Sequence, residues 1–315
     1  MTDHPDHLPV LLEQTLGLLD PRPGETSIDA TAGLGGHAAA IAPRLAPGGR
    51  IVLNDLDGSN LERAAERVRA AAGDAVEVLP VHGPFARLPG VLADRGIAAD
   101  MLLADLGFAS NQVDNPNRGF SFKQDGPLDM RLDPTRGESA ADLLARIDER
   151  ELADLIWRFG EERNSRRIAQ KLVAARRDAP MTTTSRVAQI VRSAFPAGFA
   201  RKSRIDPATR TFQALRIAVN DEIGQLEALL DAIGRGAEEQ AGPGGWLNRG
   251  ARVAIISFHS LEDRPVKRAF TDLAARGLAD RLTRKPITAD EAESRRNPRS
   301  RSAKLRAIRL ADRVE

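Results

Sequence analysis

The chain has 315 residues, which is enough to bury a full α/β core and to carry a second, smaller domain. It contains no cysteine, and this excludes disulfides, thiolate zinc sites, iron–sulfur clusters and a cysteine nucleophile. No apolar run approaches the roughly 20 residues that span a bilayer, and the N-terminus lacks the features of a secretory signal. We therefore expect a cytoplasmic protein with no membrane segment and no metal site.

The net charge of only +2 conceals two basic stretches. Residues 158–210 contain 13 Lys or Arg and four Asp or Glu, and residues 281–313 contain 11 and four. Such segregation is expected if parts of the surface meet a polyanion such as RNA. For either stretch alone, a set of solvated Arg-rich helices is the alternative interpretation.

Short apolar runs alternate with amphipathic segments along the first third of the sequence. Strands are predicted at residues 27–29, 50–54, 76–81 and 101–104, and helices at 37–45, 61–72 and 85–95. Alternating strands and helices indicate a parallel sheet, so the fold class is α/β.

This alternation stops near residue 114, where a segment rich in Gly, Pro, Asn and Asp begins. Helices are predicted after it at residues 140–145, 149–159, 165–177 and 185–194. The C-terminal part predicts a long helix at 211–233, a strand at 252–258, a helix at 261–275 capped by Ser260, a flexible basic tract at 282–301 and a strand at 303–310. These patterns predict one domain formed by residues 1–113 and 208–315, interrupted by a helical domain at 114–207.

The segment from Asp29 to His37 places a carboxylate before a glycine-rich turn that opens a helix. Glycines here let the backbone approach a ligand closely. The residues from Gly33 to Ala38 also satisfy the dinucleotide fingerprint G-x-G-x-x-G/A, so the glycines alone do not separate a nicotinamide cofactor from S-adenosylmethionine. Asp29 favours S-adenosylmethionine, whose amino acid end is cationic and which has no pyrophosphate.

Three further residues follow predicted strands. Asp55 stands about 20 residues after the glycines, where a carboxylate can hold ribose hydroxyls, although it could instead cap the next helix. Phe85 is either an adenine contact or a core residue. Asp105 ends the fourth strand, at the edge where open α/β sheets bind ligands, and a structural cap of the next turn is its alternative.

Short motifs extend over almost the whole chain. They are His7 with Pro9–Leu12, Thr31–His37, His82–Phe85, Arg118–Phe122, Gly126–Arg131, Asp133–Gly137, Gly160–Arg163, Pro207–Ala214, Val219–Asn220, Ile256–Arg264 and Asn297–Arg299. Together they resemble the bacterial 16S rRNA (cytosine(1402)-N(4))-methyltransferase family. Chance agreement of so many motifs in the same order is negligible.

The resemblance implies a class I S-adenosylmethionine-dependent methyltransferase fold, with a Rossmann-like, mostly parallel sheet and an inserted helical substrate-recognition domain. It implies cofactor contacts at Gly35, Gly36, His37, Asp55, Phe85, Asp105 and Gln112, to which the residues themselves add Asp29 and Gly33. One departure stands beside the expected reacting centre: the family usually has Val-Ser-Ser where this chain has Phe108-Ala109-Ser110.

The reaction implied is methylation of a cytosine amine in small-subunit 16S rRNA. This amine is a poor nucleophile because its lone pair is delocalised, so the Asp105 carboxylate or backbone carbonyls of the same turn must polarise it. Phe108 is a candidate surface for the unstacked base. His259 is a second catalytic candidate, with a purely structural histidine as the alternative. Without cysteine, methylation of a ring carbon through a thiol adduct is excluded.

Arg299, Arg301 and Lys304 are candidates for holding RNA phosphates, which gives affinity rather than choice of base. Two rival functions remain. One is a nicotinamide oxidoreductase, disfavoured by Asp29 and the basic C-terminal tract. The other is a ribosome-assembly factor that kept the fold and lost turnover, suggested by Phe108 and Ala109. The sequence does not define an oligomeric state.

Overall fold

A computed structural model describes residues 8–196, 205–239 and 245–312 of the chain. The chain divides into two compact units. The sheet unit comprises Met1–Gly107 and Ile223–Glu315, and the helical unit comprises Phe108–Glu222.

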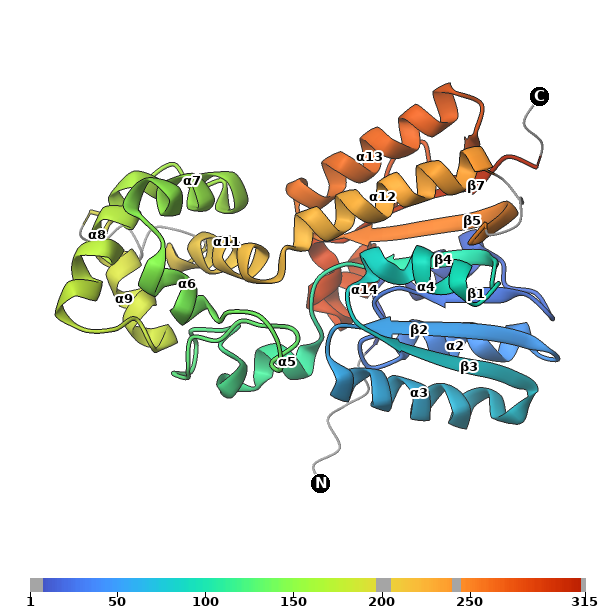
Figure 1. The fold of residues 1–315 in the computed structure, drawn as a ribbon, viewed down its shortest axis with the longest axis horizontal. Helices are drawn as coiled ribbons and strands as arrows, with labels where there is room; N and C mark the ends of the chain where they lie inside the picture. The colour runs from blue at the N-terminus through green and yellow to red at the C-terminus, as the bar shows by residue number, and fades with distance from the viewer. Residues whose placement is uncertain (1–7, 197–204, 240–244, 313–315) are drawn as a thin grey trace. The chain divides into compact units, whose positions relative to one another are not determined.

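The sheet unit is built on one mostly parallel sheet (Figure 1). Its described strands are β1 (Thr26–Asp29), β2 (Gly49–Asp55), β3 (Val76–His82), β4 (Ala99–Asp105), β5 (Leu247–Ser257), β6 (Ala279–Arg281) and β7 (Lys304–Leu310). The strand order is β3-β2-β1-β4-β5-β7-β6, and β7 runs antiparallel to both β5 and β6. The order reverses between β1 and β4, which is the point where open α/β sheets bind ligands. The predicted strands and fold class are therefore confirmed, while the short edge strand β6 was missed.

Helices cover both faces of this sheet (Figure 1). One face packs against α1 (Leu12–Leu19), α2 (Gly36–Leu45) and α3 (Gly58–Ala72), and the other against α4 (Leu88–Asp94), α12 (Glu222–Glu239) and α13 (Ser260–Ala275). Neighbouring residues of one strand enter opposite cores: Ile51 and Leu53 face the first layer, and Val52 faces the second. Short 3-10 turns η1 (Gly73–Ala75) and η2 (Phe85–Arg87) flank β3.

The helical unit has its own apolar core. Its described helices are α5 (Ser110–Asp114), the 3-10 turn η3 (Pro116–Arg118), α6 (Ala140–Arg146), α7 (Glu149–Gly160), α8 (Ser165–Asp178), α9 (Thr184–Ser193) and α11 (Ala208–Asn220). The unit is wider than the predicted insert 114–207, because α11 packs along α7 and places Phe212 and Leu215 in the same core as Ile156.

The predicted long helix 211–233 is wrong, since the chain breaks it into α11 and α12 at Asp221. Asp221 adopts a left-handed conformation with φ 49°, which Asp and Asn tolerate better than most residues. The side chain of the preceding Asn220 binds distant backbone groups: its Oδ1 accepts from the Leu132 N–H at 2.7 Å, and its Nδ2 donates to the Met130 carbonyl at 2.8 Å. These contacts span about 90 positions of sequence, so no local pattern reports them.

The predicted flexibility of residues 282–301 is also wrong. The tract contains α14 (Glu291–Arg296) and the 3-10 turn η4 (Pro298–Ser302). The Glu293 carboxylate accepts from the Leu11 backbone N–H at 2.7 Å, and Asn297 Nδ2 donates to the Leu8 carbonyl at 2.9 Å. The tract is thus anchored to the N-terminal segment. None of the helices in the described ranges combines the length and hydropathy that a membrane-spanning segment requires.

We predict that the buried Arg252 of β5 is a major source of stability. Its guanidinium donates to the carbonyls of Leu19, Asp20 and Asp100 and forms a bidentate pair with Glu25. Arg252→Met should lower the free energy of unfolding by about 3 to 5 kcal/mol, because the Glu25 charge loses its partner. The exposed neighbour Arg249 provides a control, and Arg249→Met should change stability by less than about 0.5 kcal/mol in urea denaturation. Equal stabilities of the two variants would contradict the prediction.

Candidate active site

Three carboxylates lie at the carboxyl ends of adjacent strands. Asp29 ends β1, Asp55 ends β2 and Asp105 ends β4, and the strand order places β1 between the other two. Asp29 is almost completely buried. Parallel strands deliver their last residues to one edge of a sheet, so the sequence positions of these acids were sufficient to predict their convergence.

Backbone hydrogen bonds tie the glycine-rich turn to these acids. Asp29 Oδ1 accepts from the Thr31 N–H at 3.2 Å, and Asp55 Oδ2 accepts from the Gly33 N–H at 2.7 Å. The Asp105 N–H in turn donates to Thr31 Oγ1 at 2.6 Å. The turn is therefore held against the ends of all three strands.

Two of the glycines have a packing role that the sequence did not reveal. Gly35 adopts φ +75°, and a Cβ there would lie 2.8 Å from the Ala64 Cα of α3. A Cβ on Gly36 would lie 2.8 Å from Pro9 Cγ. These glycines let α2 pack closely on its neighbours, in addition to any approach to a ligand.

The alternative role of Asp55 as a helix cap is wrong, because Asp57 caps α3. Asp57 Oδ1 accepts from the backbone N–H groups of Ser59 and Asn60. Asp55 instead divides its two oxygens, with Oδ1 accepting from the Asp57 N–H at 2.8 Å and Oδ2 from Gly33. Its ribose role stays a prediction.

Burial shifts the pKa values of two of these carboxylates, Asp29 and Asp55. Burial raises the pKa of Asp29 to about 7, and the negative charges of Asp105 and Asp55 add to this, while His37 opposes it. Burial raises the pKa of Asp55 to about 6, against the lowering effect of the Asp57 and Gly33 N–H groups. The edge is therefore rich in acceptors and short of positive charge.

His37, the second residue of α2, lies beside Asp105. Its Nε2 is 3.5 Å from Asp105 Oδ2, and its side chain is 6% exposed. Within the described ranges, Asp105 Oδ1 is buried without a hydrogen-bond partner. Buried polar atoms are rarely left so, which indicates that a ligand supplies a donor here. Hydroxyls and cationic groups fit this set of acceptors, and a pyrophosphate does not.

The remaining predicted cofactor residues lie on two short elements. Phe85 begins η2 after β3, partly buried against the core of the sheet unit, so its core interpretation has a structural basis. Gln112 of α5, in the helical unit, is buried, and its Oε1 accepts from the Ala109 N–H at 2.9 Å. The predicted cofactor contacts of Phe85 and Gln112 stay predictions.

Phe108 is one of the few exposed large apolar residues of the described chain, at 40% exposure. It packs within the helical unit, where its ring lies 5.9 Å from that of Phe120 with 22° between their planes. The Arg216 guanidinium lies 4.5 Å from the Phe108 ring centroid. The sequence predicted an aromatic surface here but not the residues that support it.

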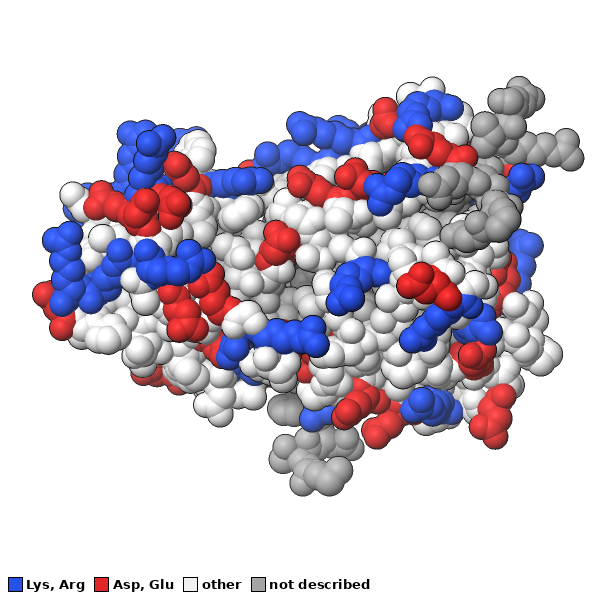
Figure 2. All heavy atoms as spheres, in the orientation of Figure 1, with Lys and Arg blue, Asp and Glu red and all other residues white. Residues whose placement is uncertain are grey.

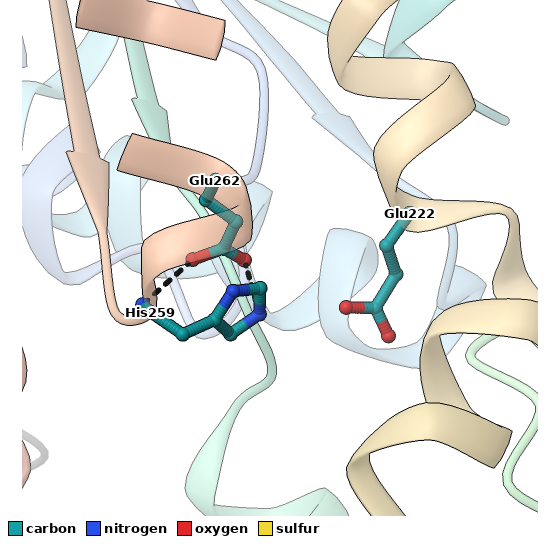
Figure 3. Close-up of side chains that lie close together, drawn as sticks. All are labelled: Glu222, His259 and Glu262. Carbon is teal, nitrogen blue, oxygen red and sulfur yellow. Dashed lines mark hydrogen bonds and ion pairs between the residues drawn. The ribbon is translucent and has the colours of Figure 1, made fainter. Parts of the chain in front are cut away.

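His259 directly precedes α13, and it, rather than the predicted Ser260, occupies the N-cap position. Glu262, which the sequence did not single out, accepts from the Phe258 N–H at 2.8 Å. It also accepts from the His259 N–H at 3.3 Å (Figure 3). Its other oxygen lies 3.3 Å from His259 Nε2. The sequence signal that could have identified Glu262 is its place three positions after the N-cap residue, which is typical of a capping box. The contact with Glu262 supports a structural role for His259, and its catalytic role stays a prediction.

The three predicted phosphate ligands lie along η4 and β7. Arg301 is exposed, Arg299 is half-buried, and Lys304 Nζ is 3.5 Å from Asp263 Oδ2. Asp263 also pairs with Arg306. On the face drawn in Figure 2, basic and acidic side chains are interspersed and form no continuous positive surface.

Comparisons with known proteins agree across both units. The model of the MraW methylase family matches residues 4–311. The chain is 47% identical to the ribosomal RNA small subunit methyltransferase H of Acidobacterium capsulatum, covering 96% of this chain and 97% of that protein. The identity to the protein of the same name from Sorangium cellulosum is 48%, covering 96% and 90%.

We predict that Asp29 makes the unliganded protein less stable as the pH rises. Its pKa is higher in the folded than in the unfolded chain, so the folded state binds the extra proton and the stability falls from about pH 4 until it levels near pH 7. The loss is at most about 4 kcal/mol. Asp29→Asn should remove this part of the pH dependence in denaturation at about pH 5 and about pH 8. The exposed control Asp94→Asn should follow the wild type, and parallel curves for Asp29→Asn would contradict the assignment.

Proposed function

Because the chain belongs to the MraW methylase family, we propose that it methylates the N4 amine of a cytosine in 16S rRNA of the small ribosomal subunit, with S-adenosylmethionine as methyl donor. The resemblance of its motifs assigns cytosine 1402. The fold is that of class I methyltransferases: a mostly parallel seven-stranded sheet with an antiparallel β7 in the described chain. Action on ribosomal RNA implies a cytoplasmic location.

The observation that carries this proposal is the acceptor-rich edge formed by Asp29, Asp55 and Asp105. S-adenosylmethionine supplies a methyl group on a positively charged sulfonium. Asp29 would hold the cationic amino acid end, and Asp55 the ribose hydroxyls. We assign the rest of the cofactor site to the residues that the sequence named: Gly33, Gly35, Gly36, His37, Phe85 and Gln112.

Asp105 is the proposed acceptor for the target amine. Its buried Oδ1 has no hydrogen-bond partner within the described ranges, so it can accept a hydrogen of the amine without breaking an existing bond. Accepting that hydrogen returns electron density to the nitrogen and favours attack on the methyl group. His37 beside Oδ2 would hold the carboxylate in place.

The RNA would be held at several places. Phe108 follows Asp105 by three residues, so their Cα atoms are at most about 11 Å apart, and we assign its ring as the surface for the unstacked base. Arg299, Arg301 and Lys304 would contact phosphates, and His259 is a further candidate at the end of β5. We assign substrate recognition to the helical unit, whose tract 158–210 carries a strong excess of Lys and Arg.

One experiment tests this function directly. The protein is incubated with labelled S-adenosylmethionine and unmodified small subunits, and the RNA is then digested and its nucleosides identified. Label in N4-methylcytidine supports the proposal. Cofactor binding without transfer would indicate the assembly factor, and binding of NAD instead of S-adenosylmethionine would indicate the oxidoreductase.

We predict that Asp105→Asn abolishes most turnover without unfolding the protein. Asparagine keeps the size of the side chain but removes the charge that polarises the amine. Methylation should fall by about 10²- to 10⁴-fold, while the melting temperature changes little. Asp94→Asn again serves as the control. Near-normal methylation per folded molecule would instead make Asp105 a turn residue, and normal chemistry with weak cofactor binding would shift the acceptor role to backbone carbonyls.

We predict that Asp55→Ala weakens S-adenosylmethionine binding at least about tenfold, because each lost ribose hydrogen bond is worth about 1 kcal/mol. The variant also frees the Gly33 N–H and loosens the turn. The matched control is Asp57→Ala, which removes the cap of α3 and costs about 1 kcal/mol of stability. Its affinity per folded molecule should be normal by calorimetry. Unchanged affinity in Asp55→Ala would refute the ribose assignment.

A further inference from the structure

The residues at the two ends of the helical unit contact each other through one arginine. Phe108 is the first residue of this unit and Glu222 the last. Arg216 of α11 lies 4.5 Å from the Phe108 ring centroid and pairs with Glu222, Nε to Oε1 at 2.8 Å and Nη2 to Oε2 at 2.9 Å. Both partners of this bidentate pair are only 12–13% exposed. Glu222 is drawn in Figure 3.

Phe120 and Arg118 form further contacts beside the Phe108 ring. Phe120 stacks beside Phe108, and Arg118 lies 5.8 Å from the Phe120 ring centroid. Arg118 Nη2 donates to the carbonyls of Arg131 and Leu132 at 3.0 and 2.8 Å. We call Phe108, Phe120, Arg118, Arg216 and Glu222 the Phe108 stack.

The chemistry of the Phe108 stack suits a base. An exposed phenyl ring normally rotates freely, and fixing it on ligand binding costs conformational entropy. Here Arg216 and Phe120 hold the ring before any ligand arrives, yet 40% of Phe108 remains exposed. Burying the Arg216–Glu222 ion pair costs desolvation free energy, which packing against the Phe108 ring alone does not explain.

We propose that Arg216, oriented by Glu222, and Phe120 are positioning residues that fix Phe108 as the surface on which the unstacked target base rests. This inference rests on the proposed function, because it needs a base to be withdrawn from RNA. It extends that function by naming the residues through which the Phe108 ring acts. Phe108 touches the base, and the other residues act through it.

The test uses the full chain with small subunits and labelled S-adenosylmethionine. Phe108→Leu keeps an apolar side chain but removes the ring, and Arg216→Met keeps a long side chain but removes the guanidinium. Each should lower kcat/KM for the subunit about tenfold, since stacking of a base on an aromatic side chain contributes at this level. Affinity for S-adenosylmethionine should stay the same. Phe108→Tyr keeps the ring and should restore activity to within about threefold of the wild type.

A double variant separates positioning from a direct contact with RNA. If Arg216 acts through Phe108, then Arg216→Met should cause no further loss in a Phe108→Leu background. Additive losses would overturn the proposal and make Arg216 a separate RNA contact, and full activity of either single variant would also overturn it. If the wild type itself does not methylate 16S rRNA, the proposed function fails first, and this is distinguishable from a selective failure of the variants.

The chain offers a matched control. Arg192 lies 5.4 Å from the Phe122 ring centroid and pairs with Asp206, so it makes the same kinds of contact in the same unit without touching Phe108. The Arg192 pair is more exposed than the Arg216 pair, so Arg192→Met should cost less stability than Arg216→Met, and it should keep its methylation per folded molecule. If Arg216→Met fails to fold, Glu222→Gln is the second variant. It leaves Arg216 in the chain but removes the carboxylate that orients its guanidinium, so kcat/KM for the subunit should again fall.

Discussion

The candidate active site depends on three carboxylates that parallel strands bring to one edge, because burial removes two of them, Asp29 and Asp55, from water. Burial raises the pKa of Asp29 and of Asp55, and the negative charges of Asp105 and Asp55 add to the effect at Asp29. Backbone N–H groups oppose the rise at both acids, and His37 opposes it at Asp29. Such an arrangement is costly in an empty protein. Under the proposed function, a cationic, hydroxyl-bearing ligand would offset this cost by supplying hydrogen-bond donors and positive charge. The bonds of the glycine turn to two of these acids make its conformation part of the same arrangement.

The features that the sequence predicted are those with local causes. Amphipathic spacing predicted α7, α8 and α9 to within one or two residues, because each buries one face in a common core. The place of the acids followed from a single rule, that parallel strands end at the same edge. The resemblance to a known family added residues such as Gln112, which carry no local signal of function.

The features that were missed depend on contacts between distant positions. The break at Asp221 and the order of the C-terminal tract follow from side chains such as Asn220 and Asn297, which bind backbone groups about 90 and 290 positions away. The composition of residues 282–301 predicted a flexible tract, because composition carries no information about hydrogen bonds to distant parts of the chain. The contact between Arg216 and the Phe108 ring could not be predicted either, because the two residues are far apart in the sequence.

The departure from the family pattern at Phe108 and Ala109 is compatible with catalytic activity. Ala109 is the N-cap of α5 and makes no side-chain capping bond, while Gln112 accepts from its backbone N–H. A serine at this position would cap the helix, so its absence lowers helix stability by about 1 kcal/mol and removes no acid or base. Phe108, in turn, adds a supported aromatic ring where the family usually has valine. Both differences alter how the chain after Asp105 is held, and both leave the carboxylate itself in place, which favours an active enzyme over an assembly factor that has lost turnover.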